Sequence, residues 1–166
     1  MSGITPAFVL SREAELSELV YDRSGCVAKM VADGLTLEAE EMLKGYAFAI
    51  LVGSKILGGV VFSDYRAGDS AWISIYTTDK RWCTAKILKQ IFGLAFDALH
   101  CRRLNALICA DNRASISLSE RCGFVCEGRM RNYFDDGADA LIFGMLRSEC
   151  KFINNQYKEN ENVQRI

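Results

Sequence analysis

The stretch that decides the fold is residues 71–110, AWISIYTTDKRWCTAKILKQIFGLAFDALHCRRLNALICA. It begins with a strand-like segment, Ala71–Thr77, and ends with the short apolar segment LNALICA, residues 104–110. Between them, apolar residues recur at helical spacing from Cys83 to His100, which predicts one long helix with a broad buried stripe. A strand, a helix and a strand buried on both faces form a βαβ crossover, so we expect the two strands to pair in parallel.

Upstream of this unit the chain predicts an antiparallel meander. Tyr46–Val52 and Lys55–Tyr65 are strand-like segments separated by Gly53-Ser54, a short hairpin signal, and the strand at 71–77 follows after one further turn.

The first third of the chain predicts two helices. One runs from a cap at Ser11 to about Tyr21, and a shorter one runs over Leu37–Lys44. Thr36 is placed to cap the start of the second helix, and Gly45 to end it. The segment between them, residues 22–35, gives little signal.

Downstream, a further helix begins at Asp111-Asn112 and ends at Cys122 before Gly123. Phe124–Met130 and Ala140–Leu146 predict a C-terminal hairpin. Gly93, inside the long helix, indicates a close approach by another backbone. The fold class is therefore α/β (α+β), a mixed sheet in which an antiparallel meander is followed by a βαβ crossover, a helix and a hairpin.

Composition bounds the function. The 166 residues predict a single domain over residues 1–150 and a polar tail over 151–166. Twenty basic against 21 acidic residues give a net charge of −1, which argues against a nucleic-acid or membrane-surface binder. No apolar stretch is long enough to span a membrane.

Seven cysteines, none at CxxC spacing, and a single histidine argue against a disulfide scaffold, a metal site and a His-dependent triad. The expected location is the cytoplasm. We expect Cys109, Cys122 and Cys126 to pack as small buried hydrophobes.

Residues 112–124, NRASISLSERCGF, followed by Glu127-Gly128-Arg129, carry a family resemblance. An Asn, a Ser three positions later, a short helix closing in Gly-Phe and then Glu-Gly resemble the last motif of the GNAT superfamily of N-acetyltransferases. The branch it resembles contains the ribosomal-protein N-terminal acetyltransferases. The ending GMLRSEC, residues 144–150, is similar to phage- and prophage-encoded members. The resemblance covers residues 46–150.

This resemblance implies a site for acetyl-CoA as co-substrate, with no metal. The pyrophosphate would lie where the strand at 71–77 meets the long helix, because a helix N-terminus favours anions. Asn112 would hydrogen-bond the pantetheine arm. The implied cofactor-binding residues are Ile75, Thr77, Lys80, Arg81, Trp82, Cys83, Thr84 and Asn112.

The phosphate loop departs from the family pattern, in which two glycines let the backbone approach the phosphates. Here Thr77, Lys80 and Trp82 stand at the aligned positions, so charge from Lys80 and Arg81 and stacking by Trp82 would replace the glycines. The alternative is that Lys80 and Arg81 are a solvated loop pair.

The candidate catalytic residues are Ser115, Tyr76 and Ser119. Ser115 would lie near the thioester sulfur, and Ser119 stands where the family often has a tyrosine that protonates the thiolate. Backbone amides over Ile75–Thr77 would stabilise the oxyanion. The plain alternatives are that Asn112 caps a helix and that Ser115 bonds its first turn.

The strand at 71–77 has no carboxylate that could serve as a base, so the acceptor amine must be partly neutral without one. At pH 7 roughly 14% of an α-amine is neutral, against roughly 0.04% of a lysine side chain. We expect the acceptor to be an amine-bearing small molecule or a protein, bound around Tyr21, Tyr46 and Tyr133 by a monomer or homodimer. The alternatives are a non-catalytic GNAT-fold protein that binds CoA weakly or a protein partner, and a thiol enzyme that uses Cys83.

Overall fold

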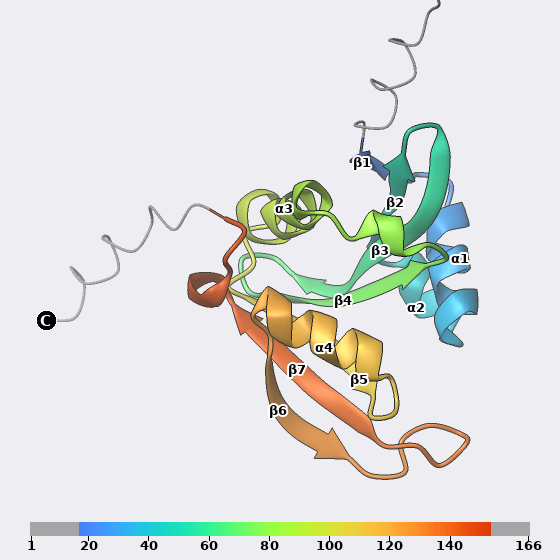
Figure 1. The fold of residues 1–166 in the computed structure, drawn as a ribbon, viewed down its shortest axis with the longest axis vertical. Coiled ribbons are helices and arrows are strands. Elements are labelled where there is room, and N and C mark those ends of the chain that lie inside the picture. Colours follow the sequence, from blue (N-terminus) through green and yellow to red (C-terminus); the bar gives the residue numbers. More distant parts are fainter. Residues whose placement is uncertain (1–16, 154–166) are drawn as a thin grey trace, which may run out of the picture. The chain divides into compact units, whose positions relative to one another are not determined.

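The computed structural model describes residues 17–153 (Figure 1). Within them, seven strands form one sheet in the order β1-β2-β3-β4-β5-β7-β6. The elements are β1 (Ser17–Tyr21), α1 (Cys26–Leu35), α2 (Ala39–Leu43), β2 (Tyr46–Val52), β3 (Lys55–Arg66), β4 (Ser70–Thr77), α3 (Ala85–Gly93), β5 (Arg103–Cys109), α4 (Arg113–Cys122), β6 (Val125–Met130) and β7 (Ala140–Leu146).

The predicted architecture is confirmed. β4 and β5 pair in parallel, as expected for a βαβ crossover, and β7 pairs antiparallel with both β5 and β6. β2 has the predicted bounds, and Gly53 turns the chain into β3 with a φ of 61°. Gly123 closes α4 with a φ of 109°, which is the left-handed conformation that favours glycine.

The described chain divides into two compact units, and the division runs through β3, β4 and α3. Unit 1 holds residues 17–61 and 75–90, and unit 2 holds residues 62–74 and 91–153. Each unit has buried apolar residues of its own.

In unit 1, the buried face of α1 packs on the sheet and on α2, which runs beside it (Figure 1). Val27 and Val31, four positions apart, lie on this face with Ala47 and Ala49 of β2. An added Cβ on Gly59 of β3 would overlap Val27 and lie 3.0 Å from Val31 Cγ2. A side chain at this glycine would therefore push α1 away from the sheet.

In unit 2, β5 is buried on one face only. Leu104, Ala106 and Ile108 are buried, whereas the alternate residues are partly exposed. The prediction of a strand buried on both faces is therefore wrong, because the second face carries a polar network. In that network the Arg103 guanidinium donates to both carboxylate oxygens of Glu127, which lowers the pKa of Glu127.

The predicted long helix over 83–100 consists of several pieces. A 3-10 turn, Lys80–Trp82, precedes α3, and a π-helical turn, Leu94–Ala98, follows it. The carboxylate of Asp97 and the carbonyl of Phe96 both accept bonds from Arg147. Gly93 stands where the α-helix changes to the π turn, and an added Cβ there would meet only Asp97, at 3.9 Å. The predicted close backbone approach at Gly93 is therefore wrong.

The first third of the chain differs most from the prediction. The helix expected to run to Tyr21 is wrong over the described part, because residues 17–21 form β1 and pair antiparallel with β2. Its predicted cap, Ser11, lies outside the described residues. A helix instead occupies most of the segment that gave little signal.

The start of α2 also differs. Thr36 adopts a left-handed φ of 55° and closes α1, so its predicted role as the cap of the next helix is wrong. Glu38 is the N-cap of α2 and Lys44 its C-cap, while the Gly45 N–H donates to the Met42 carbonyl.

Candidate functional site

The end of β4 is fixed by two glycines in unit 1. An added Cβ on Gly34 of α1 would overlap the ring of Tyr76, and one on Gly58 of β3 would overlap the Tyr76 carbonyl oxygen and lie 2.7 Å from Thr77 Cα. The Thr78 N–H continues this pairing with a 2.9 Å bond to the Leu57 carbonyl. The backbone of Tyr76 and Thr77 is therefore closely packed against Gly58, and the Tyr76 ring against Gly34.

The hydroxyl of Tyr76 is available for chemistry. The side chain is half-buried against the unit 1 core, and its oxygen has no hydrogen-bond partner within residues 17–153. No buried side-chain polar atom in this part of the chain lacks a partner, so the Tyr76 oxygen reaches solvent. A group in this position can donate a proton.

The connection from β4 to α3 is tied together by Asp79. Its carboxylate accepts the Arg81 backbone N–H at 2.9 Å and pairs with the Arg81 guanidinium at 2.9 and 2.6 Å. These bonds, of which the one from the guanidinium has the largest effect, lower the pKa of Asp79 to about 2. The Arg81 guanidinium is therefore paired with the Asp79 carboxylate, whereas Lys80 is exposed and forms no ion pair within the described chain.

Most backbone donors of this connection are also used internally. The N–H groups of residues 82, 83 and 84 donate to carbonyls within the connection. The Thr84 hydroxyl accepts the Ile87 N–H at 3.2 Å and its carbonyl accepts the Leu88 N–H at 3.0 Å, so Thr84 is the N-cap of α3. The connection thus lacks the row of open donors that a glycine-rich phosphate loop presents.

The other predicted binding residues in this region differ in exposure. Trp82 is 6% exposed and lies in the core, with contacts to β2. Ile75 and Thr77 are half-buried and Cys83 is exposed. A stacking role for Trp82 would therefore have very little ring surface to use.

In unit 2, Asn112 stands at the start of α4 as its N-cap. Its side-chain oxygen accepts the Ser115 N–H at 3.0 Å, so the capping interaction expected as the plain alternative is present. The Asn112 amide nitrogen is left to donate to a ligand. Ser115 and Ser119 are both half-exposed, and the Ser119 carbonyl accepts the N–H groups of Gly123 and Phe124 at the other end of the helix.

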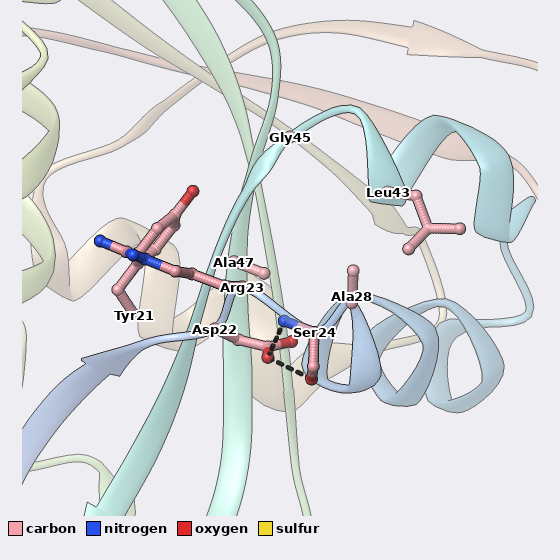
Figure 2. Close-up of a pocket in the computed structure, with 9 residues that line it drawn as sticks. Tyr21, Asp22, Arg23, Ser24, Ala28, Leu43, Gly45 and Ala47 are labelled. Atoms are coloured by element: carbon pink, nitrogen blue, oxygen red, sulfur yellow. Dashed lines mark hydrogen bonds between the residues drawn. The ribbon is translucent and has the colours of Figure 1, made fainter.

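A hollow of about 530 Å³ opens beside the start of α1, between Tyr21, Leu43 and Ala47 (Figure 2). Asp22 closes the helix start: its carboxylate accepts both the N–H and the hydroxyl of Ser24, and the Val27 N–H at 2.7 Å. These bonds lower the pKa of Asp22.

The predicted acceptor residues fall into both units. In unit 1 the rings of Tyr21 and Tyr46 lie 6.5 Å apart, and both side chains are exposed. Tyr133 belongs to unit 2, where its ring meets Phe134 edge-on at 5.1 Å.

The cysteines divide into buried and exposed sets. Cys101 and Cys150 are buried, and burial raises the pKa of both thiols. Cys122 is buried as predicted, but Cys126 lies exposed on the last strand of the sheet order and Cys109 is half-buried. The prediction that all three are buried is therefore wrong. Residues 17–153 contain no group of three or more His, Cys, Asp or Glu side chains that could hold a metal ion.

The sequence was compared with known protein families, and the acetyltransferase (GNAT) domain model matches residues 13–125. The chain belongs to the GNAT acetyltransferase family. Comparison with curated proteins gave no match.

Several solved GNAT structures share this fold. The spermidine N-acetyltransferase of Vibrio cholerae, in complex with CoA and spermine, is 16% identical and has a TM-score of 0.68, covering 83% of this chain and 98% of that one. A GNAT family acetyltransferase from Elizabethkingia anophelis with acetyl-CoA bound is 13% identical with a TM-score of 0.67, covering 80% and 99%. A dodecameric form of the Vibrio enzyme is 15% identical with a TM-score of 0.67, covering 84% and 98%.

Sequence reasoning missed the two glycines that pack against the end of β4. Gly34 and Gly58 carry no visible signal, because glycine is also common in turns. The Asp22-x-Ser24 pattern just before an apolar i, i+4 pair was a usable signal for the start of α1.

Among residues 17–153, none of the helices has the length and apolar character that a membrane-spanning helix requires.

Proposed function

We propose that this GNAT protein is an N-acetyltransferase that transfers the acetyl group of acetyl-CoA to an amine by direct attack. The observation that carries the proposal is the family match over residues 13–125. The free hydroxyl and the fixed backbone at the end of β4 support it, because they supply a proton donor and preorganised amides.

In the proposed reaction a neutral amine attacks the thioester carbonyl carbon. The C–N bond forms, and the carbonyl oxygen becomes an oxyanion that the N–H groups of residues 75–77 stabilise. When the oxyanion collapses, the C–S bond breaks, the amine proton passes to water, and the CoA thiolate accepts a proton. Tyr76 is our first candidate for that donor, with Ser115 and Ser119 as alternatives.

For the phosphates we propose Lys80 as the main cation, with the first turn of α3 beside it. Among residues 17–153 no carboxylate pairs with Lys80, whereas Arg81 is held by Asp79. Ile75, Thr77, Trp82, Cys83 and Thr84 then shape the backbone rather than bind through their side chains. We propose that the amide nitrogen of Asn112 binds the pantetheine arm.

The acceptor is proposed only as a class. Without a strand carboxylate an α-amine is the easier nucleophile, in keeping with the resemblance to the ribosomal-protein N-terminal acetyltransferase branch. The complex of the Vibrio relative with spermine makes a small polyamine the second substrate to test. We propose one acyltransferase domain over residues 1–150, acting in the cytoplasm as a monomer or homodimer. Its similarity to phage-encoded members stays a prediction.

A non-catalytic GNAT-fold protein is the second candidate function. The observation that favours it is the β4–α3 connection, whose backbone donors and Arg81 are already used within the chain. Such a protein would bind CoA weakly, or a protein partner, and act as an inhibitor or adaptor.

Calorimetric titration with acetyl-CoA and with CoA separates the two. Saturable binding at micromolar affinity, followed by mass spectrometric detection of an acetylated α-amine peptide or polyamine, supports the enzyme. Absence of binding at millimolar ligand would leave the partner-binding protein. Binding without a product from any amine in the panel would also contradict catalysis.

A further inference from the structure

Gln90, in the last turn of α3, binds the backbone of the edge strand β1 with both ends of its carboxamide. Its oxygen accepts the Leu19 N–H at 2.9 Å, and its nitrogen donates to the Ser17 carbonyl at 3.1 Å. Gln90 lies about seventy positions from Ser17 and Leu19 in the sequence, and all three residues belong to unit 1. Because two hydrogen bonds come from one side chain, they fix both the distance and the orientation of α3 relative to β1.

The two backbone groups that Gln90 binds are those that β1 turns away from its neighbour. β1 is the first strand in the sheet order, so β2 pairs with one edge only. Leu19 stands opposite Ile50 and Ser17 opposite Val52. In an antiparallel ladder the groups of such alternate residues point outward together, where a further strand would bind them. The carboxamide of Gln90 supplies one donor and one acceptor, as a residue of that further strand would.

The same contact fixes α3. Gln90 lies six positions after Thr84, roughly 9 Å along a helix, so a constraint on Gln90 is transmitted to the first turn. The β4–α3 connection is ordered by bonds within itself, from the N–H groups of residues 82–84 and between Asp79 and Arg81. Trp82 and the Thr84 cap hold one end of the segment, and Gln90 holds the other.

We propose that Gln90 is a positioning residue for acetyl-CoA binding: by clamping α3 to the open edge of β1, it sets the place of the helix turn that meets the phosphates. This role rests on the function proposed above. Gln90 itself need not touch the cofactor. Its effect is on the affinity for acetyl-CoA and not on the amine acceptor.

The test uses the full chain with Gln90→Met, which keeps the length and helix propensity of the side chain but removes both bonds. The matched control is Lys89→Met, an exposed neighbour on the same helix. We expect the Leu19 amide of Q90M to exchange with deuterium about tenfold faster, since it loses its acceptor. We expect its Kd and KM for acetyl-CoA to rise about three- to tenfold, with the KM for the amine and kcat unchanged. Lys89→Met should change none of these.

Gln90→Glu serves as the conservative variant if Q90M does not fold. Its carboxylate accepts the Leu19 N–H but cannot donate to the Ser17 carbonyl. We therefore expect its Kd for acetyl-CoA to be higher than that of the wild type, by less than the three- to tenfold rise expected for Q90M. Fast exchange at Leu19 with an unchanged Kd in Q90M, or an unchanged Kd in Gln90→Glu, overturns the positioning role alone. A wild-type protein that binds no acetyl-CoA overturns the proposed function as well, so the two failures are distinguishable.

Discussion

Two strand-to-helix connections of this protein, β4 to α3 and β5 to α4, fix the start of a helix in different ways. In unit 2, three residues suffice, and one local bond from Asn112 to Ser115 caps the helix. In unit 1, the connection spans residues 78–84, and the elements on either side are held by contacts distant in sequence: Gly34 and Gly58 pack against the end of β4, and Gln90 of α3 binds the backbone of β1.

This difference indicates at which residues a substitution can change ligand binding without changing stability. At Asn112, the oxygen caps the helix and the nitrogen is left for the proposed ligand contact, so the cap and the proposed contact reside in different atoms of one side chain. Around Tyr76, the packing and the proposed chemistry involve the same backbone, so we expect a change there to affect both. The substitutions below test this contrast, beginning with the largest expected effect.

Gly58→Ala should destabilise the protein most. Its Cβ would overlap the Tyr76 carbonyl and approach Thr77, and backbone can yield little, so we expect a loss of about 3 kcal/mol in the free energy of unfolding. Urea denaturation measures it. The control is Gly93→Ala, where φ is −62° and the space is open; it should stabilise the helix by about 0.5 kcal/mol. Equal effects at the two glycines would contradict the close packing of β4.

Asn112→Ala should lower stability by about 1 kcal/mol through loss of the cap and should also weaken acetyl-CoA binding about tenfold. Asn112→Asp separates the two effects, because aspartate caps helices but has no amide N–H. We expect it to retain stability and still lose affinity in calorimetry. Full affinity in the aspartate variant would leave Asn112 as a cap only.

Asp79→Asn should remove one contribution to the pH dependence of the protein's stability. The Arg81 guanidinium and N–H lower the folded-state pKa of Asp79 to about 2, below its ordinary value of 3.8, so its stabilising effect is present above about pH 4 and is lost as pH falls toward 2. The Arg81 side chain is largely exposed and that of Asp79 is partly exposed, so the effect is small and screened by salt. Thermal unfolding at low salt, compared between the variant and wild type over this pH window, measures it.

The same substitution releases Arg81 for the cofactor. We expect Asp79→Asn to tighten acetyl-CoA binding slightly at low salt, by roughly twofold, because one carboxylate is removed and one cation is freed. Weaker binding would show that the Asp79–Arg81 pair is itself part of the phosphate site.

Cys83→Ser should have the smallest effect. Direct attack by an amine needs no enzyme thiol, so acetyl transfer should stay within about twofold of wild type. Loss of activity on replacing this exposed thiol would favour the thiol enzyme instead.

Much of the fold was predictable because its signals are local. The periodicity of residues 46–77, the apolar β5 segment and the glycines at 53 and 123 placed four of the strands, their turns and the end of α4. β1 was not predictable in this way, because five residues with one buried side chain become a strand only when β2 offers a partner. The predicted long helix likewise changes to a π turn at Gly93, where Arg147, about fifty residues later in the sequence, donates to the Phe96 carbonyl. The spacing of apolar residues does not indicate such a contact.

The sequence by itself determined the family, the order of most elements and the absence of the phosphate-loop glycines, since each depends on residue types at fixed spacing. Only the tertiary structure decided which of the candidate residues are available for chemistry. Lys80 and Arg81 are adjacent cations, yet a carboxylate two residues away holds one of them. Trp82 is buried, the hydroxyl of Tyr76 has no hydrogen-bond partner within residues 17–153, and Gln90 reaches β1. These last three outcomes depend on long-range contacts, which spacing along one chain does not encode, whereas the Asp79–Arg81 pair depends on the local conformation of the connection.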